Sequence, residues 1–407
     1  MIKKYTYGNP FFTESVVASF EASEGMPEVG TVNLDNGFSF LYDMKAEDAV
    51  YGLGEANRGI NKRGYKYISN NTDIPNHHED VYSLYASHNF VVISGERTFG
   101  LYIDYPSSLV FDIGYTKMDE LHIFCDKADL DLYVITGESI YDIVKQFRQM
   151  IGKSYIAPKF AFGFGQSRWG YKTPEDFAYV VKKYRENHIP IDMVYMDIDY
   201  MDHYKDFTIN EAFGDFSEYV EELKKENIRL IPIIDAGVKI EEGYDVYEEG
   251  VANNYFCKRE DGSDFVAAVW PGYTHFPDVL NPEARKWFGG KYKLLTDAGI
   301  EGFWNDMNEP AIFYTPEGVC EVKEAMREFI DKEESVDDVW GIRDMVADLA
   351  NNAKDYASMY HNMNGKMVRH DQVHNLFGYN MTRAAGEALR EICPEKRCLL
   401  FSRSSYI

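Results

Sequence analysis

The chain has 407 residues, of which 45% are hydrophobic and 27% are charged, so its composition is that of a soluble globular protein and its length that of about two domains. Its net charge of −25 repels phosphate backbones and anionic lipid surfaces, which argues against a nucleic-acid or membrane partner. The five cysteines are scattered without a Cys-x-x-Cys pair, which argues against a disulfide framework and a structural zinc site.

The N-terminal sequence MIKKYTYGNPFFTE contains two lysines but no apolar run behind them. Elsewhere no stretch approaches the roughly 18 apolar residues that a membrane helix requires. We therefore expect neither a signal peptide nor a membrane span, and we expect a cytoplasmic location.

Residues 1–150 show the pattern of β structure. Short segments rich in Val, Ile, Phe and Tyr are separated by Gly, Pro, Asn and Asp at the spacing of a β-sandwich. These segments include Asn89–Ser94, Thr98–Asp104, Leu109–Phe111 and Leu121–Phe124. A helical stretch, Ser139–Ile151, then leads into the Pro-containing joint Ile156–Lys159. We expect an N-terminal β-sandwich domain over residues 1–150 and a second domain over residues 151–407.

In the second domain, short apolar runs alternate with amphipathic helical stretches. The apolar runs are Phe160–Gly165, Ile191–Asp197, Leu230–Asp235, Gly302–Asp306 and Cys398–Ser402. The helical stretches are Pro174–Asn187, Phe216–Asn227, Pro282–Ala298 and Thr382–Ile392. Buried strands that alternate with helices predict a parallel sheet.

Polar residues with catalytic potential stand at the end of each apolar run. They are Gln166, Asp197, Asp235, Asp306 and Arg403. This placement is typical of a (β/α)₈ barrel, whose active site lies at the carboxyl ends of the strands. A doubly wound open sheet would show the same alternation, but the fingerprint G-x-G-x-x-G is absent after the first strand. We therefore favour the barrel.

Two long connections, near residues 236–281 and 310–379, interrupt the alternation. The second is highly charged over Glu321–Asp348 with helical spacing, which predicts a solvated helical insertion. Five strand–helix units are recognisable, whereas a closed barrel has eight. The sequence ends directly after a buried strand, so we expect an incomplete barrel, truncated at its C-terminus.

The strongest local signal is the string Gly302–Pro310, Gly-Phe-Trp-Asn-Asp-Met-Asn-Glu-Pro. Two carboxylates, two amides and a tryptophan stand together at the end of a strand. Glycoside hydrolysis needs one carboxyl group below the anomeric carbon and an acid near the leaving oxygen. A single Asp at this place would be interpreted as a helix cap or a loop carboxylate, but the whole string favours catalysis.

A second cluster, Tyr195–Asp202, carries carboxylates at the end of another strand. Period-two spacing would place Asp197 and Asp199 on one side, where carboxylates can accept paired hydrogen bonds from sugar hydroxyls. Metal binding is the alternative use, but no adjacent histidine completes a ligand set, and His203 is expected at the surface. We expect neither a metal nor a cofactor.

Several strings in this sequence resemble one enzyme family. They are Trp-Asn-Asp-Met-Asn-Glu-Pro, Met-Asp-Ile-Asp-Tyr-Met-x-x-Tyr-Lys-Asp-Phe-Thr, Gly-Gln-Ser-Arg-Trp-Gly-Tyr, Val-Trp-Pro-Gly, Val-Tyr-Gly-Leu-Gly-Glu and Phe-Ser-Arg-Ser. They are similar to the α-glucosidases of glycoside hydrolase family 31, and they occur in the family's order along the whole chain.

The resemblance implies that Asp306 is the catalytic nucleophile. It implies a glucose-binding subsite −1 formed by Asp197, Ile198, Asp235, Trp270, Trp304, Met307 and Arg403, with Trp169 at its mouth and Asp73 reaching it from an N-terminal loop. In the family the general acid/base is an aspartate in a Trp-x-Gly-Asp motif beyond the arginine strand, and these 407 residues contain no such motif. Glu309 is expected to brace the nucleophile loop.

The function that this resemblance implies is that of a retaining exo-α-glucosidase, which releases terminal glucose from α-linked oligosaccharides through a covalent intermediate on Asp306. Because the acid/base is missing, we expect the chain as given to be inactive alone. Two alternatives stay open: a non-catalytic sugar-binding fragment, and an α-xylosidase-like specificity. The nucleophile strand of family α-xylosidases usually reads Lys-Thr-Asp-Phe-Gly-Glu, which favours glucose here.

Overall fold

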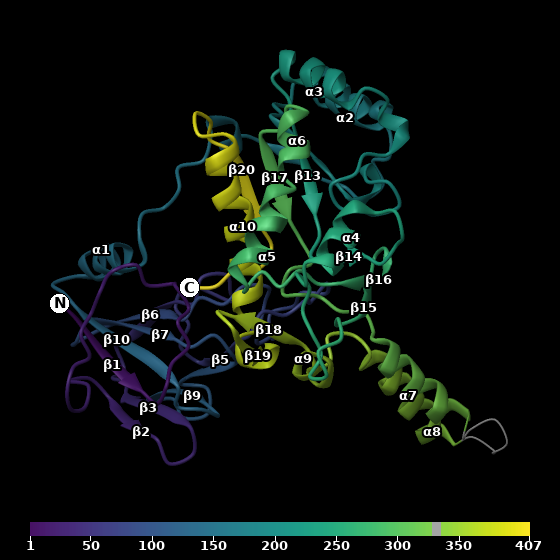
Figure 1. The fold of residues 1–407 in the computed structure, drawn as a ribbon. Helices are drawn as coiled ribbons and strands as arrows, with labels where there is room; N and C mark the ends of the chain where they lie inside the picture. The colour runs from purple at the N-terminus through teal and green to yellow at the C-terminus, as the bar shows by residue number, and fades with distance from the viewer. Residues whose placement is uncertain (328–334) are drawn as a thin grey trace. The chain divides into compact units, whose positions relative to one another are not determined.

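A computed structural model describes residues 1–327 and 335–407, which divide into two units (Figure 1). Unit 1 comprises Met1–Tyr155, Gln372–Leu376 and Ser404–Ile407. Unit 2 comprises Ile156–Asp371 and Phe377–Arg403. None of the helices in these described ranges has both the length and the apolar character needed to cross a membrane.

Unit 1 is built on two antiparallel sheets of five strands each. The first sheet has the order β1 (Ile2–Tyr7), β10 (Leu130–Thr136), β7 (Phe99–Asp104), β6 (Phe90–Ser94), β4 (Ala49–Gly52). The second has the order β2 (Thr31–Asn33), β3 (Phe38–Asp43), β9 (Glu120–Cys125), β8 (Leu109–Ile113), β5 (Tyr65–Ser69). Side chains of both sheets, such as Leu101 and Phe111, meet in one buried core. The predicted β-sandwich is confirmed.

Helix α1 (Ile140–Ile151) covers the other face of the first sheet. The side chain of Ser139 caps the helix by accepting a hydrogen bond from the backbone N–H of Asp142 (3.2 Å). On the helix face toward the sheet, Phe147 stacks on Phe90 with ring centroids 3.8 Å apart. The amphipathic pattern thus places the helix where the sequence predicts it.

Unit 2 contains a parallel sheet of five strands. Their order is β11 (Gly165–Gln166), β12 (Met193–Met196), β13 (Arg229–Ile234), β17 (Gly302–Asn305), β20 (Leu399–Ser402). Neighbouring strands follow each other in chain order, without the reversal that defines a doubly wound sheet. This is the arrangement of successive strands in a (β/α)₈ barrel, and the predicted incomplete barrel is confirmed.

Helices follow the strands of this sheet, as Figure 1 shows. They are α2 (Pro174–Glu186), α3 (Phe216–Lys225), the pair α5 (Pro282–Gly290) and α6 (Lys293–Asp297), and α10 (Leu376–Ile392). Their starts carry local signals. Thr173 and Asp176 form a capping box before α2, and the side chain of Asp215 accepts a hydrogen bond from the N–H of Glu218 (3.0 Å) before α3.

Several predicted elements differ from the structure. The helix expected over Thr382–Ile392 begins earlier, at Leu376, and two other differences have local causes. The expected strand Phe160–Gly165 is largely a 3₁₀ turn over Lys159–Phe162, because Pro158 begins a turn whose carbonyl accepts a bond from the N–H of Ala161 (3.0 Å). The expected helix Pro282–Ala298 is broken into α5 and α6, after two consecutive glycines that have low helix propensity.

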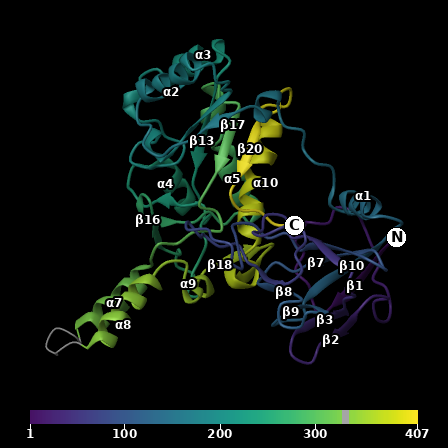
Figure 2. The same ribbon diagram turned by 180° about the vertical axis from the view of Figure 1, so that it is seen from behind.

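The two long connections form substructures of their own. The first contains β14 (Val238–Lys239), α4 (Asp245–Ala252), β15 (Ala267–Val269) and β16 (Gly272–His275). The second contains α7 (Pro316–Arg327), α8 (Val336–Ala347), α9 (Ala353–Ser358), β18 (Tyr360–Met363) and β19 (Lys366–Arg369). In both views α7 and α8 project from the rest of unit 2, and neither has a buried residue over its described length (Figures 1 and 2). The predicted charged insertion is helical there, and residues 328–334 lie outside the described residues.

Gly302, the first residue of β17, provides a test of the sheet. A Cβ atom at this position would lie 2.5 Å from Ile231 Cδ1 and 3.0 Å from Leu399 Cβ, between the two neighbouring strands. We expect Gly302→Ala to lower the free energy of unfolding by about 1–3 kcal/mol in urea denaturation. The control is Gly290→Ala at the exposed end of α5, where a Cβ meets nothing within 4 Å and alanine should stabilise by up to about 1 kcal/mol. Equal effects of the two changes would contradict the tight strand packing.

Candidate active site

Four of the predicted site residues follow directly on strands of the parallel sheet. Asp197 follows β12, Asp235 follows β13, Asp306 follows β17 and Arg403 follows β20. Because parallel strands end at the same edge of a sheet, these four side chains stand at one edge. The hydrogen bonding between β13 and β17 continues one residue past the end of β17, since the N–H of Asp306 donates to Ile234 O (3.0 Å).

Asp306 is buried at this edge beside a guanidinium group. Its side chain is 11% exposed, and Oδ1 lies 3.1 Å from Nε of Arg403. The cation attracts the ionised form of the carboxyl group, which is the form that can attack carbon. The next residue, Met307, has a φ of 55°, so the chain turns sharply after the nucleophile candidate.

Glu309 holds this arginine in place. Arg403 donates from Nε to Glu309 Oε1 (2.9 Å) and from Nη2 to Oε2 (2.6 Å), a bidentate pair. Nη2 also lies 3.4 Å from Sδ of Met307, and Glu309 is fully buried. Glu309 is thus linked to Asp306 through Arg403, and its expected role of bracing a nucleophile loop stays a prediction. Contact of Arg403 with a sugar stays a prediction.

Asp197 begins a short 3₁₀ helix, Ile198–Tyr200. Its Oδ1 accepts a hydrogen bond from the N–H of Ile198 (2.8 Å), and burial raises the pKa of its carboxyl group above the usual value. Strand β12 ends before Asp197, so period-two spacing does not place Asp199 beside it; Asp199 lies within the 3₁₀ helix. Sequence reasoning missed this turn, because it extended the strand too far.

Asp235 is 4% exposed at the end of β13. Burial raises the pKa of its carboxyl group well above the usual range, and the neighbouring Asp206 acts in the same direction. Asp206 lies in the Lys-Asp-Phe-Thr part of the second motif, and sequence reasoning assigned it no role.

Three aromatic residues lie within the strands, two positions before three of the polar residues at the edge. Tyr195 contacts Trp304 edge-to-face with ring centroids 6.1 Å apart, and it contacts Phe401 at 6.4 Å. Tyr195, Trp304 and Phe401 each precede an edge residue by two positions, so each faces the same side of the sheet as that residue. They form an aromatic layer beneath the carboxylates.

The remaining predicted site residues lie on loops. Trp270, 50% exposed, lies in the turn between β15 and β16 and packs edge-on against Phe313 (4.8 Å). Trp169 is 66% exposed after β11. Asp73 belongs to unit 1, after β5. The contribution of these three residues to a sugar site stays a prediction.

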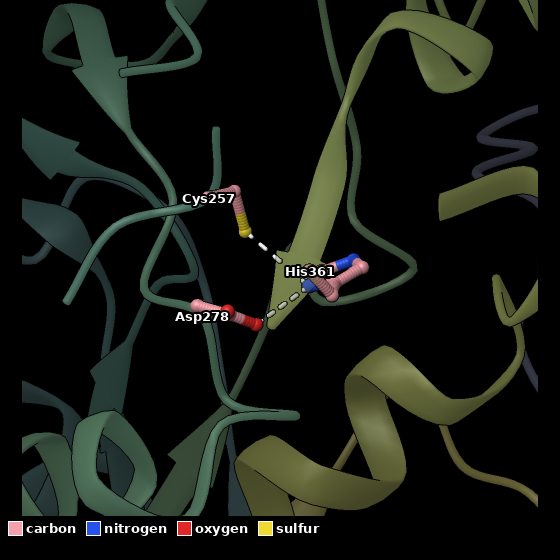
Figure 3. Close-up of side chains that lie close together, drawn as sticks. All are labelled: Cys257, Asp278 and His361. Carbon is pink, nitrogen blue, oxygen red and sulfur yellow. Dashed lines mark hydrogen bonds and ion pairs between the residues drawn. The ribbon is translucent and has the colours of Figure 1, made fainter. Parts of the chain in front are cut away.

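The structure also gathers three buried groups that are far apart in the sequence and have metal-ligand chemistry: Cys257, Asp278 and His361 (Figure 3). The His361 Nδ1 to Asp278 Oδ1 distance is 2.7 Å, a hydrogen-bond length, whereas two such ligands on one zinc ion stand roughly 3.3–3.5 Å apart. His361 Nε2 also lies 2.8 Å from Nδ1 of His370, and Asp278 Oδ2 accepts from the N–H of Asn362 (2.7 Å). These contacts identify a hydrogen-bonded network that fastens the β18–β19 hairpin.

Comparison with known families matches both parts of the chain. Residues 154–407 match the model of the glycosyl hydrolases family 31 TIM-barrel domain. Residues 7–112 match the glycosyl hydrolase 31 N-terminal galactose mutarotase-like domain.

Curated relatives include α-glucosidases and an α-xylosidase. Alpha-glucosidase 2 of Bacillus thermoamyloliquefaciens is 31% identical over 366 residues, which cover 89% of this chain and 42% of that protein. Alpha-glucosidase of Saccharolobus solfataricus is 25% identical, covering 100% and 57%. Alpha-xylosidase 1 of Arabidopsis thaliana is 28% identical, covering 89% and 41%. The chain thus spans about two fifths to three fifths of these relatives.

Solved structures share the fold. A Flavobacterium johnsoniae GH31 dextranase complexed with glucose superimposes with a TM-score of 0.76 at 23% identity, covering 92% of this chain and 41% of that chain. A GH31 α-xylosidase from a soil metagenome, complexed with xylose, has a TM-score of 0.67 at 19% identity, covering 95% and 49%. At these identities the likeness shows the fold.

The ion pair between Glu309 and Arg403 should matter for stability. Changing Glu309 to Ala leaves the arginine without its bidentate partner in a largely buried setting, so we expect the free energy of unfolding to fall by about 3–5 kcal/mol. The matched control is Glu321→Ala, whose exposed pair with Lys354 should contribute less than about 1 kcal/mol. Urea denaturation measures the free energy of unfolding of both variants. A loss for Glu309→Ala as small as that of the control would contradict a stabilising role of the ion pair between Glu309 and Arg403.

Proposed function

The chain belongs to glycoside hydrolase family 31, and we propose that the enzyme containing it is a retaining exo-α-glucosidase that releases terminal glucose from α-linked oligosaccharides. One observation carries the proposal. Asp306 stands buried at the carboxyl edge of the barrel sheet, beside the guanidinium group of Arg403 and above an aromatic layer. A carboxylate held in this way has the position and the charge of a nucleophile.

The proposed reaction has two steps. In the first, an oxygen of Asp306 attacks the anomeric carbon, the bond from that carbon to the leaving oxygen breaks, and an acid protonates the leaving sugar. In the second, a water oxygen attacks the anomeric carbon, the bond from that carbon to Asp306 breaks and frees the carboxylate, and the acid, now deprotonated, accepts the water's proton. Two inversions at the anomeric carbon retain its configuration. Residues of this chain hold the nucleophile: Arg403 orients Asp306, and Glu309 orients Arg403.

The acid/base of this mechanism should lie about 5–5.5 Å from the nucleophile carboxyl group. The family resemblance assigns that role to an aspartate in a Trp-x-Gly-Asp motif, which these 407 residues do not contain. We propose that the full-length enzyme supplies it from elsewhere. General acid catalysis typically contributes on the order of 10²–10⁴-fold, so the 407 residues alone should turn over oligosaccharides far more slowly than the complete enzyme.

Glucose is favoured over xylose as the sugar in subsite −1. The strand around Asp306 reads Trp-Asn-Asp-Met-Asn-Glu, the α-glucosidase form of the family motif. Comparing the kcat/KM of the full-length enzyme on aryl α-glucosides and aryl α-xylosides decides between the two sugars. A higher kcat/KM on the xyloside would contradict the α-glucosidase proposal and favour an α-xylosidase.

Asp306 is the residue to test first. In the full-length enzyme, Asp306→Asn should lower kcat by several orders of magnitude and leave the fold intact, because the residue caps a strand and does not build the core. A fluorinated α-glucosyl fluoride, which forms the ester quickly and releases it slowly, should label the wild-type enzyme on the peptide that contains Asp306. Mass spectrometry of the digested protein reads out the label.

Asp297→Asn, on the exposed surface of α6, is the control and should keep wild-type turnover. Label on another peptide would remove Asp306 from the role of nucleophile. Near-normal hydrolysis by Asp306→Asn would do the same.

Activity should not depend on a divalent metal. The carboxylates at the sheet edge are assigned to the nucleophile, to sugar hydroxyls and to Arg403, and the Cys257–Asp278–His361 network has hydrogen-bond distances. We expect kcat and KM of the full-length enzyme to be unchanged after dialysis against a chelator. A loss of activity that zinc or calcium restores would contradict this assignment.

A further inference from the structure

Two buried aspartates contact each other directly behind the sheet edge. Asp206 is 1% exposed and comes from the loop after β12, whereas Asp235 is 4% exposed and follows β13. The backbone N–H of Asp235 donates to Oδ1 of Asp206 at 2.9 Å, so the two residues are in contact.

No cation neutralises this pair within the described part of the chain. Lys205, next to Asp206 in sequence, instead directs Nζ to Asp202 Oδ2 (2.9 Å) and to Glu241 Oε1 (2.8 Å). Arg403, which faces Asp235 from the next strands, pairs with Asp306 and Glu309. Two buried carboxylates without a partner cation would repel each other in a medium of low dielectric constant.

Three tyrosines face the pair, but each hydroxyl donates elsewhere. Tyr200 donates to Ile233 O (2.8 Å), Tyr244 donates to the backbone O of Asp206 (2.8 Å), and Tyr292 donates to Asn305 Oδ1 (2.6 Å). Burial raises the pKa of all three phenols, so each keeps its one proton in that bond.

One oxygen of each carboxyl group is therefore left over. Oδ2 of Asp206 and Oδ1 of Asp235 are buried, and no described donor reaches either of them. Buried acceptors without a donor are rare, because each costs about 1–3 kcal/mol. A proton bound by one of the two groups removes the charge repulsion and turns one of these buried acceptors into an O–H group.

We propose that Asp206 and Asp235 hold a single proton between them at neutral pH, carried by Asp235, and that Asp206 is thereby a positioning residue that keeps Asp235 uncharged beside Asp306. The inference rests on the proposed function, because it concerns the electrostatics of that nucleophile.

The surroundings decide which group carries the proton. Asp206 accepts a backbone N–H, which favours its ionised form, whereas Asp235 faces the negative charges of Asp306 and Asp197. Burial raises the pKa of both groups well above the usual range, and the charge of Asp206 raises that of Asp235 further. Arg403 acts in the opposite direction on Asp235, but it is bound to two other carboxylates.

Two isosteric variants separate the role of Asp235, which carries the proton, from that of Asp206, which keeps Asp235 protonated. In Asp235→Asn the position beside Asp306 stays neutral, as proposed for the wild type. In Asp206→Asn the side-chain amide can keep the bond from the N–H of Asp235 and turn an N–H toward its carboxyl group, which favours ionised Asp235. The negative charge then moves next to Asp306.

The first test needs no activity. Infrared spectra of the full-length wild-type enzyme at neutral pH should contain the C=O stretching band of a protonated carboxyl group that is absent from Asp235→Asn and from Asp206→Asn, and unchanged in the exposed control Asp297→Asn. If the spectra of the wild type and of Asp235→Asn do not differ in this band, the proposal is overturned. A band that persists in Asp206→Asn shows that Asp235 holds its proton without Asp206, which also overturns it.

The second test uses the pH profile of kcat/KM on an aryl α-glucoside. An ionised Asp235 disfavours ionisation of Asp306, so the acid limb of Asp206→Asn should move to higher pH by about one unit. The acid limb of Asp235→Asn should stay where it is in the wild type, whatever its kcat. Equal shifts in both variants, or none in Asp206→Asn, would overturn the positioning role. If the enzyme were inactive on every glycoside, the infrared result would still decide the shared proton, so the two proposals can fail separately.

Discussion

A shortage of positive charge governs the edge of the barrel sheet. Arg403 faces Asp306, Glu309 and Asp235, and its one charge cannot neutralise three carboxylates in a buried setting. The structure resolves the conflict by geometry. Glu309 accepts hydrogen bonds from Nε and Nη2 of the guanidinium group, Oδ1 of Asp306 lies 3.1 Å from the same Nε, and Asp235 contacts Asp206 through its backbone N–H. An ionised Asp306, the nucleophile that we propose, is compatible with these neighbours if Asp235 is neutral, as we also propose.

The parallel sheet determines which side chains can share this environment. Successive side chains alternate between the two sides of a strand. Tyr195 and Asp197, Trp304 and Asp306, and Phe401 and Arg403 are each two positions apart, so the aromatic layer and the charged edge are built by the same strands. The aromatic rings contact each other across neighbouring strands. Tyr195 and Trp304 are half-buried and Phe401 is 49% exposed, so this aromatic surface is open to solvent in the described residues.

Local patterns in the sequence were sufficient for the fold and for the residues at the strand ends. Alternating apolar runs and capped amphipathic helices predict the parallel sheet, and the string around Asp306 predicts a carboxylate at its edge. The same patterns fail where a contact is made by residues far apart in the chain. Nothing near Asp206 in sequence indicates that it meets Asp235, and the network of Cys257, Asp278 and His361 joins three separate segments.

The ends of two strands were also predicted wrongly from the sequence, and the reason is physical. Phe160–Phe162 is apolar enough for a strand, but Pro158 starts a turn there, and the hydrogen bonds of this segment close locally. The strand before Asp197 ends one residue earlier than its apolar character suggests, because the carboxylate caps the turn that follows. In both places a local hydrogen bond competes successfully with sheet pairing, which composition alone does not show.

The turn at Met307 lies between Asp306, the proposed nucleophile, and Glu309, which pairs with Arg403. Asp306 and Glu309 are three residues apart, a spacing that would direct their side chains apart if β17 continued. A φ of 55° at Met307 bends the chain instead, and both carboxylates reach the same guanidinium group. A left-handed conformation at a residue other than glycine costs on the order of 1–3 kcal/mol, so it persists only where other contacts hold it. Here the bidentate pair, the contact of Arg403 with Met307 Sδ and the bond from Ala311 N–H to Met307 O (3.0 Å) hold the turn. The strain at Met307 is therefore part of what positions Asp306, and the same arginine both contacts this proposed nucleophile and stabilises the bend that follows it.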